Sequence, residues 1–144
     1  MKSISLSIIL LLSVLTATNA QNSITLNITN IEDQSGKLYI AVYNPNVPFL
    51  SDKAISGKII DVTGQTAAVT FENLEEGEYA IAMFHDKNNN EKLDLGKYGI
   101  PTEKYGFSNN VDPALSQGSP AFEECKFDVK GNTCISIKLI SAIK

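Results

Sequence analysis

KLYIAVY, residues 37–43, is the stretch that decides the fold. Successive side chains of an extended segment face opposite ways, so Leu38, Ile40 and Val42 share one side of it. Turn-forming residues at 34–36 come directly before. Strict alternation over this length predicts a β-strand with one face in a hydrophobic core.

Six further segments of the chain repeat this pattern. They are residues 23–31, 58–62, 66–72, 78–85, 122–129 and 133–140. Residues 63–65 and 130–132 have the length and composition of hairpin loops. No window has a sustained helical period. The pattern predicts an all-β, antiparallel sandwich of about seven strands, of the immunoglobulin-like or transthyretin-like kind. The tryptophan typical of true immunoglobulin domains is absent.

The first twenty residues are typical of an export signal. Lys2 precedes a short apolar run, and Ala20 ends a small-residue cleavage site. The run is shorter than the ~20 apolar residues that a membrane helix needs. We therefore expect a signal peptide at residues 1–20 and one domain at residues 21–144, with no membrane span after cleavage. The expected location is the periplasm, the cell surface or the medium.

The charge balance favours some partners over others. Residues 21–144 carry 11 lysines against 16 acidic residues, a net charge of −5, and the chain has no arginine. Nucleic acids and anionic membranes are bound mainly by basic surfaces, and arginine dominates phosphate and base recognition. The composition argues against both partners and suits a cation.

Two cysteines, Cys125 and Cys134, leave a disulfide open. Export permits one. Cys125 is expected to face inward with Phe127 and Val129, whereas the alternation of the last strand turns Cys134 outward. Two cysteines are too few for a structural zinc site.

Between residues 86 and 121 the strand pattern stops, and polar residues and glycines take over. Connections of this length are uncommon and are often functional. The segment still carries apolar groups to bury, namely Tyr98, Ile100, Tyr105, Phe107 and Leu115. We expect an ordered loop packed on one end of the sandwich.

Oxygen-bearing residues occur at every second position where this loop begins. Asp86, Asn88, Asn90 and Asp94 take positions 1, 3, 5 and 9 of a calcium-loop numbering, and the carbonyl of Lys92 takes position 7. Ca²⁺ prefers six to eight oxygen ligands, which such a loop supplies from alternate residues. The spacing predicts a weak calcium site, with a Kd on the order of 10⁻⁴–10⁻³ M.

The loop also departs from an EF-hand. Glu91 stands where a glycine makes the sharp turn, and Lys97 stands where a glutamate closes the shell. Glu103 is the carboxylate that we expect to complete the site, with Asp112 behind it. The alternative is a loop without metal, whose side chains cap their own backbone.

The strings FHDKNNNEKLD (84–94) and GIPTEKYGFSNN (99–110), followed by a Pro-x-Phe at 120–122, resemble a bacterial family. The family is the one catalogued as domain of unknown function 2141. The resemblance covers nearly all of residues 21–144 and implies an exported β-sandwich. It implies no activity. A glycine often stands in this family at the position of Glu91.

The second string offers a different binding chemistry. Tyr98, Tyr105 and Phe107 could form an aromatic surface beside Asn109 and Asn110, which suits a glycan or a peptide. The alternative is that the rings plug the open end of the sandwich. Exposed and clustered rings are what the ligand hypothesis requires.

His85 is the single histidine of the chain. A hydrolase would need it beside a nucleophile such as Ser108 with Asp86 as orienter, and no nucleophile-elbow motif surrounds that serine. Paired carboxylates such as Asp86 and Asp94 would need a defined separation, which sequence does not give. We assign no catalytic residue and do not expect enzymatic activity.

The sequence thus favours an exported, non-enzymatic binding or structural module with a weak Ca²⁺ site organising its long loop. The alternative is a metal-free sandwich that recognises a glycan, peptide or protein outside the cytoplasm. A hydrolase that uses His85 is the third hypothesis.

Overall fold

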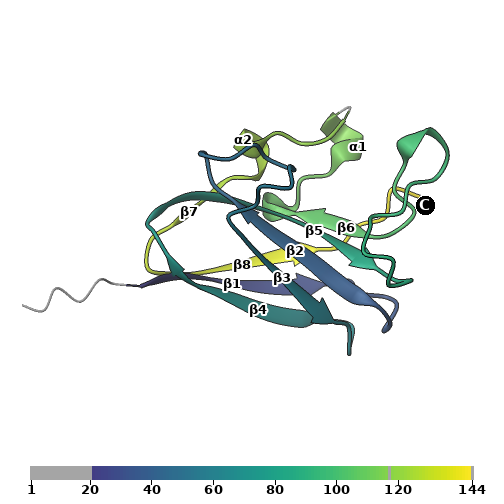
Figure 1. The fold of residues 1–144 in the computed structure, drawn as a ribbon, viewed down its shortest axis with the longest axis horizontal. Coiled ribbons are helices and arrows are strands. Elements are labelled where there is room, and N and C mark those ends of the chain that lie inside the picture. Colours follow the sequence, from purple (N-terminus) through teal and green to yellow (C-terminus); the bar gives the residue numbers. More distant parts are fainter. Residues whose placement is uncertain (1–20, 117, 144) are drawn as a thin grey trace, which may run out of the picture.

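The computed structural model describes residues 21–116 and 118–143, and in them eight strands form two stacked sheets (Figure 1). The smaller sheet has the order β4-β1-β8, and the larger has the order β3-β2-β5-β6, with β7 also pairing with β5. The strands are β1 (Asn22–Thr29), β2 (Lys37–Tyr43), β3 (Ser56–Asp61), β4 (Ala67–Leu74), β5 (Gly77–Asp86), β6 (Tyr105–Phe107), β7 (Phe127–Val129) and β8 (Asn132–Lys138). The export signal predicted for residues 1–20 lies outside the described residues.

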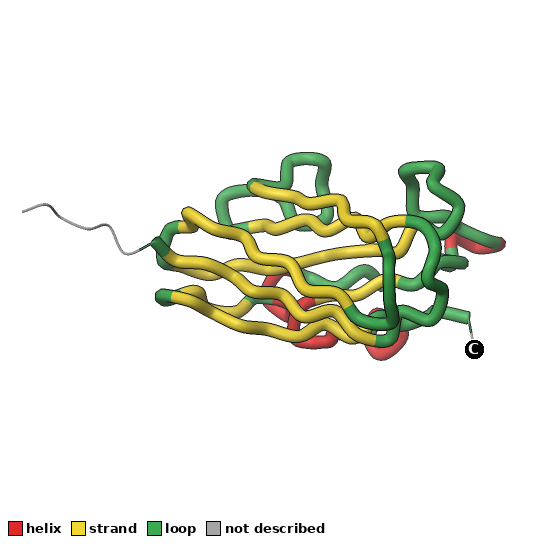
Figure 2. The backbone as a smooth tube through the Cα atoms, turned by 90° about the horizontal axis from the view of Figure 1, so that it is seen from below, coloured by secondary structure: helices red, strands yellow, loops and turns green. Residues whose placement is uncertain are grey.

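Helical structure in the described residues is limited to single turns. These are the 3₁₀ turns η1 (Lys97–Gly99) and η2 (Ser108–Asn110) and the short helices α1 (Pro113–Ser116) and α2 (Phe122–Cys125). None of them has the length and apolar character needed to span a membrane. Figure 2 shows the strands running along the long axis of the molecule, with the longer loops projecting from the sheets.

The prediction of an all-β sandwich is confirmed. Several details differ from the sequence analysis. Neither predicted hairpin forms, because residues 63–65 lead from β3 to β4 in the other sheet, and residues 130–132 lead from β7, which pairs with β5, to β8, which pairs with β1. Residues 122–125 form a helical turn instead of the start of a strand, because the Glu124 carboxylate accepts the Ala121 N–H at 2.7 Å and caps that turn. The three-residue strand β6 was not foreseen, since it lies in a run of glycines and polar residues.

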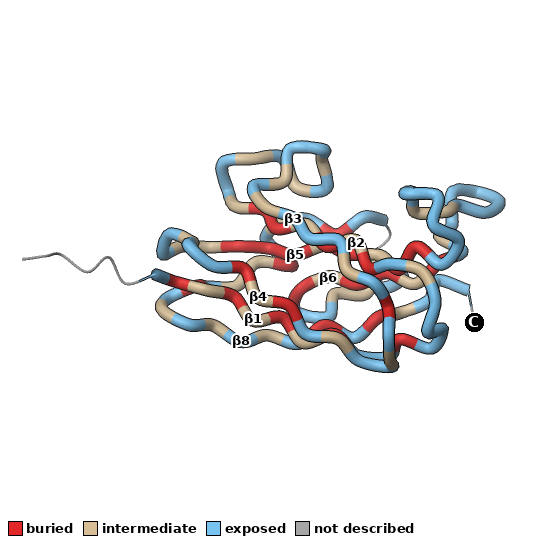
Figure 3. The backbone as a smooth tube through the Cα atoms, turned by 60° about the horizontal axis from the view of Figure 1, so that its bottom comes forward, coloured by how far each residue is buried: buried red, intermediate tan, exposed pale blue. Residues whose placement is uncertain are grey.

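The core lies between the sheets and follows the alternation of the strands (Figure 3). Leu38, Ile40 and Val42 of β2 are buried, as the opening stretch predicts. β1 and β5 contribute Ile24, Leu26, Ile28, Tyr79, Ile81 and Met83. The smaller sheet pairs β1 in parallel with β8, which adds Ile137 to the same core.

Both cysteines are free thiols in this structure, with Cys125 buried and Cys134 exposed. Burial raises the pKa of the Cys125 thiol to about 11, and the neighbouring Glu124 charge acts in the same direction. Cys125 is therefore protonated and unreactive at neutral pH.

The turn before β2 packs against the end of β5, where the long loop begins. His85, which is 1% exposed, donates its ring Nε2–H to the carbonyl of Ser35 at 2.6 Å. Gly36 has a φ of +77°, and a Cβ built on it would lie 2.0 Å from the backbone oxygen of Asp86. The turn therefore needs glycine for its backbone conformation and for space.

Replacing Gly36 with alanine should destabilise the protein by about 2–4 kcal/mol, because left-handed strain and the displaced backbone each cost about 1–3 kcal/mol. Urea unfolding would measure this loss. Gly64→Ala is the matched control, since its added Cβ would come no closer than 3.7 Å to another atom. Equal stability of the two variants would contradict the assigned packing.

Candidate functional site

The outward face of the larger sheet carries a cross-strand row of very small side chains. Ala41 of β2 pairs with Gly57 of β3 on one side and with Ala82 of β5 on the other. Ala82 in turn pairs with Phe107 of β6. Residues that pair across strands stand side by side on one face. The row is therefore a trough that runs across the strands and meets a phenylalanine ring at β6.

The next row along the strands is made of large side chains and forms one wall. Tyr39 pairs with Ile59 and with Phe84, and Phe84 pairs with Tyr105. The rings of Tyr39 and Phe84 stack with centroids 5.0 Å apart and an interplanar angle of 9°. Such a stack is favourable beyond its buried area and holds both rings upright.

The opposite wall is an aromatic cluster around Phe49, in the loop between β2 and β3. Its ring makes edge-on contacts with Tyr43, Phe107 and Phe122, with centroids 5.2–6.4 Å apart. The Tyr43 hydroxyl donates to the carbonyl of Ser51 at 3.0 Å, which ties the loop to β2.

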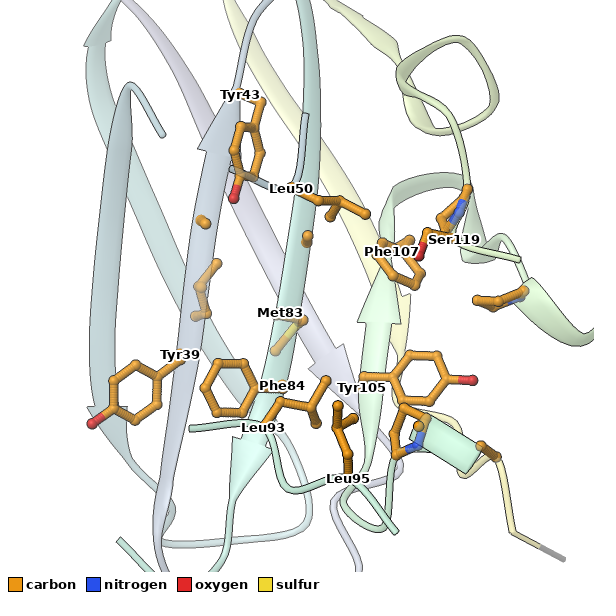
Figure 4. Close-up of a pocket in the computed structure, with 18 of the residues that line it drawn as sticks. Tyr39, Tyr43, Leu50, Met83, Phe84, Leu93, Leu95, Tyr105, Phe107 and Ser119 are labelled. Carbon is orange, nitrogen blue, oxygen red and sulfur yellow. The ribbon is translucent and has the colours of Figure 1, made fainter. Parts of the chain in front are cut away.

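These walls border part of a groove of about 1250 Å³, which continues past β6 to Pro113, Ala114 and Ser119. Figure 4 shows Tyr43, Leu50 and Phe107 on one side of it and Tyr39 and Phe84 on the other. Four of its lining residues are large exposed hydrophobics: Leu50 (40% exposed), Ile59 (58%), Leu95 (59%) and Ile100 (43%). Much of the exposed aliphatic surface of the described chain is therefore gathered around one groove.

Few polar groups face this groove. Lys58 is the one charged residue among its described lining residues, and its Nζ donates to the carbonyl of Thr70 at 2.6 Å. Burial raises the pKa of Tyr39, Tyr43 and Tyr105, each with a smaller contribution from nearby carboxylates. The phenols are therefore neutral at physiological pH, and the surface is close to uncharged.

The loop from residue 87 to 104 forms part of the groove rim and is held by two buried carboxylates. Asp86, fully buried, accepts the backbone N–H groups of Asn90 and Glu91 at 3.1 and 2.8 Å. Glu103, 5% exposed, accepts the N–H groups of Lys87 and Asp94 at 2.8 and 3.0 Å. Glu103 thus clamps the two ends of the turn together.

The remaining members of the predicted calcium set lie inside that turn. Asp94 accepts from the side-chain amides of Asn88 and Asn90 at 2.5 and 2.7 Å. Each asparagine oxygen also accepts a backbone N–H two residues ahead, from Asn90 and Lys92. Glu91 has a φ of +65°, so it adopts the left-handed turn that glycine makes in a calcium loop.

The structure thus brings Asp86, Asn88, Asn90, Asp94 and Glu103 to one loop, with their oxygens engaged in hydrogen bonds. Within residues 21–116 and 118–143, no group of three or more His, Cys, Asp or Glu side chains is arranged to hold a metal ion. A cation would therefore rely on amide and carbonyl oxygens, with Asp94 as the most accessible carboxylate of the set.

The residues predicted to bind a glycan or peptide separate into three groups. Tyr105 and Phe107 line the groove, with ring centroids 5.8 Å apart. Tyr98 is 85% exposed and lies under the Lys97 ammonium instead.

Asn109 and Asn110 serve the backbone. Asn109 donates to the carbonyls of Glu124 and Lys126. Asn110 bridges β8 by donating to the carbonyl of Ser136 and accepting the N–H of Lys138. Their amides hold η2 against its neighbours.

The side chains considered for catalysis also bind backbone groups. Ser108 is fully buried, accepts the N–H of Ile81 and donates to the carbonyl of Cys125. The ring of His85 is bound to Ser35 and the carboxylate of Asp86 to the loop. These contacts give all three side chains a structural role.

A model of a family described as an uncharacterized protein conserved in bacteria (DUF2141) matches residues 26–136. The chain belongs to this family. The match includes the groove strands β2, β3, β5 and β6 and the whole loop from 87 to 104. No curated protein matches the chain, and no solved structure does.

In this DUF2141 chain, sequence reasoning missed most of the groove. Tyr39 and Ala41 stand opposite the predicted buried face of residues 37–43, and the sequence analysis assigned no face to Ala82 and Phe84. The available signal was partial, since Tyr39, Ala41 and Tyr43 alternate aromatic and small residues, whereas β5 has two alanines before Phe84 on that side. Which of these residues pair is decided by strand register, which the pattern alone does not give.

Replacing Glu103 with glutamine should destabilise the protein by about 1–3 kcal/mol, because an amide offers one acceptor oxygen where the carboxylate accepts two partly buried hydrogen bonds. Hydrogen exchange at Lys87 and Asp94 should accelerate together, while exchange in β1 should follow only the global change. Glu72→Gln, on an exposed position of β4, is the control and should stay within about 0.5 kcal/mol of the wild type. Unchanged exchange at both amides would contradict the clamp.

Proposed function

We propose that this DUF2141 chain is an exported, non-enzymatic binding module, and that the groove on the outer face of its larger sheet is the binding site. The observation that carries the proposal is the gathering of exposed Leu50, Ile59, Leu95 and Ile100 around one aromatic-walled groove. Exposed aliphatic groups scattered singly are ordinary on proteins, whereas a contiguous patch marks an interaction site.

The construction of the groove supports the same proposal. Its walls are held by the Tyr39–Phe84 stack and by the edge-on contacts of Phe49, so the shape exists without a ligand. Ligand sites are typically concave, mostly apolar and largely preformed. The volume of about 1250 Å³ is at or above the upper end of the usual range for small-molecule sites, which is about 300–1,000 Å³.

The neutral fluorophore 1-N-phenylnaphthylamine is a suitable first probe of the groove. We expect it to bind the wild type with enhanced emission, and Ala82→Leu to weaken its binding at least tenfold, because leucine fills the floor of the trough. Ala82 faces outward between buried neighbours, so the core is left unchanged. Thermal unfolding of the variant within a few degrees of the wild type would verify this.

Ala68→Leu is the matched control. It makes the same change at an exposed position of β4, on the other sheet, and should bind the probe like the wild type. Equal binding by the wild type and both variants would place the probe elsewhere and refute the assignment of the groove. Absence of binding to the wild type would do the same.

We propose as a second function that the turn at residues 86–94 binds Ca²⁺ weakly. Two observations favour it. The side chains of Asn88, Asn90 and Asp94 converge within hydrogen-bonding distance, and Glu91 already has the left-handed conformation of a calcium loop. An amide oxygen that accepts one N–H keeps a second lone pair for a ligand. The carbonyl of Lys92 lies in the same turn.

Calcium at 1 mM should raise the midpoint of thermal unfolding by a few degrees relative to EDTA, whereas magnesium should not. A site with a Kd near 0.1 mM would add about 1.4 kcal/mol under these conditions. Asp94→Asn should abolish the rise, because it removes the most accessible charge of the set, and the buried Asp86 is left intact.

Asp128→Asn, at an exposed position of β7, is the control variant and should respond to calcium like the wild type. A wild-type midpoint that does not move up to 10 mM calcium would mean that the turn is held by its own hydrogen bonds alone. The groove proposal is independent of that result.

A further inference from the structure

We propose that the groove takes one long, unbranched acyl chain of a single-chain lipid such as a free fatty acid. This inference rests on the proposed binding function and names its ligand class. It follows from two properties of the groove, which are its lack of hydrogen-bonding groups and its width.

The lining offers almost nothing to a polar ligand. Strands β2 and β5 are paired on both sides, so their backbone groups are used within the sheet and are not free to bind a ligand. Ser119 and the tyrosine hydroxyls are nearly all of its polar side-chain groups. A glycan or a peptide main chain buried here would lose water without gaining partners, which costs about 1–3 kcal/mol per group. A hydrocarbon chain has no such groups.

Pairing with the edge of the sheet would not place a peptide in the trough. β3 is an edge strand, and an added peptide strand could bind its free backbone edge. Such a strand would run along β3 and leave the trough empty, because the trough crosses the strands through Gly57, Ala41 and Ala82.

The width of the trough also excludes a helix. Its two walls begin at Tyr39 and Tyr43, which are four residues and therefore about 13 Å apart along β2. The aromatic side chains of the walls occupy part of that distance. A helix with its side chains needs about 10–12 Å by itself. A single extended hydrocarbon chain fits between the rings.

The two ends of the trough differ. Phe107 stands at the β6 end, with its ring against Phe49 and Tyr105. At the β3 end the floor is Gly57, beside the exposed Ile59. The methyl end of the chain would reach Phe107, beyond which the lining continues over Pro113, Ala114 and Ser119, and the headgroup would remain in water beyond β3. The Lys58 ammonium donates to the carbonyl of Thr70, so it does not require a negatively charged headgroup as a partner.

The length of the trough sets the shortest chain that would span it. From β3 to β6 there are three strand spacings, or about 14 Å. An extended carbon chain advances roughly 1.25 Å per bond, given bonds of about 1.5 Å. A chain of about 12 carbons therefore spans the trough.

Displacement of bound 1-N-phenylnaphthylamine by saturated fatty acids of 8 to 16 carbons, each kept monomeric, tests this inference. Affinity should rise about two- to fourfold for each added methylene, since burying a methylene fully is worth about fourfold. The rise should continue to at least 12 carbons. Ala82→Leu should weaken binding of the 12-carbon acid at least tenfold, and Ala68→Leu should leave it unchanged.

Two further competitors separate the acyl chain from other occupants. They are a capped peptide of alternating valine and threonine, and phosphatidylcholine vesicles. Displacement by the peptide, or binding to vesicles with no displacement by monomeric fatty acids, would overturn the acyl-chain inference and leave the groove as the binding site. Equal affinities for the fatty acids of 8 to 16 carbons would also overturn it. Failure of the fluorophore itself to bind the wild type would instead refute the proposed function.

Discussion

The alternation of side chains along β5 is the constraint on which the rest of this structure depends. One set of its residues, Tyr79, Ile81 and Met83, fills the core between the two sheets. The other set includes Ala82 and Phe84, which supply part of the floor and part of a wall of the groove. A slip of one residue in register would exchange the two faces and destroy the core and the groove together. Stability therefore enforces the geometry of the outer surface as well as that of the interior.

The buried carboxylates extend this constraint into the long loop. Asp86 ends β5 and binds two N–H groups of the turn that follows, and Glu103 joins the two ends of that turn just before β6. Without these acceptors the turn would not be held through its partly buried backbone N–H groups, and it would lose its defined shape. Leu95 and Ile100 reach the groove from the segment that Glu103 holds. Two acidic side chains thus give a glycine-rich loop a defined shape at the edge of an apolar surface.

Much of the fold could be predicted from sequence because period-two alternation is a local signal. It gave most of the strands with small errors at their ends. β6 was not predicted because three residues are too few to show alternation. Its position depends on backbone hydrogen bonds between Tyr105 and Ile140, which are distant in sequence. The loop residues were found by their residue types, yet the same oxygens suit a cation or a backbone N–H, and sequence does not distinguish these partners. The groove was missed because Gly57, Ala41 and Ala82 are unremarkable one at a time and form a trough only through pairing.

Ligand binding to the loop and ligand binding in the groove are expected to be thermodynamically coupled. Leu93 and Leu95 flank Asp94 in sequence and line the groove, so any ligand that orders this turn changes the free energy of the apolar rim. Linkage is reciprocal: if a cation at Asp94 tightens binding in the groove by some factor, then an occupied groove tightens cation binding by the same factor. A cation that binds with equal affinity to the filled and the empty groove would couple nothing. The coupling free energy therefore depends on how far the hydrogen bonds of Asp94 with Asn88 and Asn90 differ between the protein with a filled groove and the protein with an empty groove.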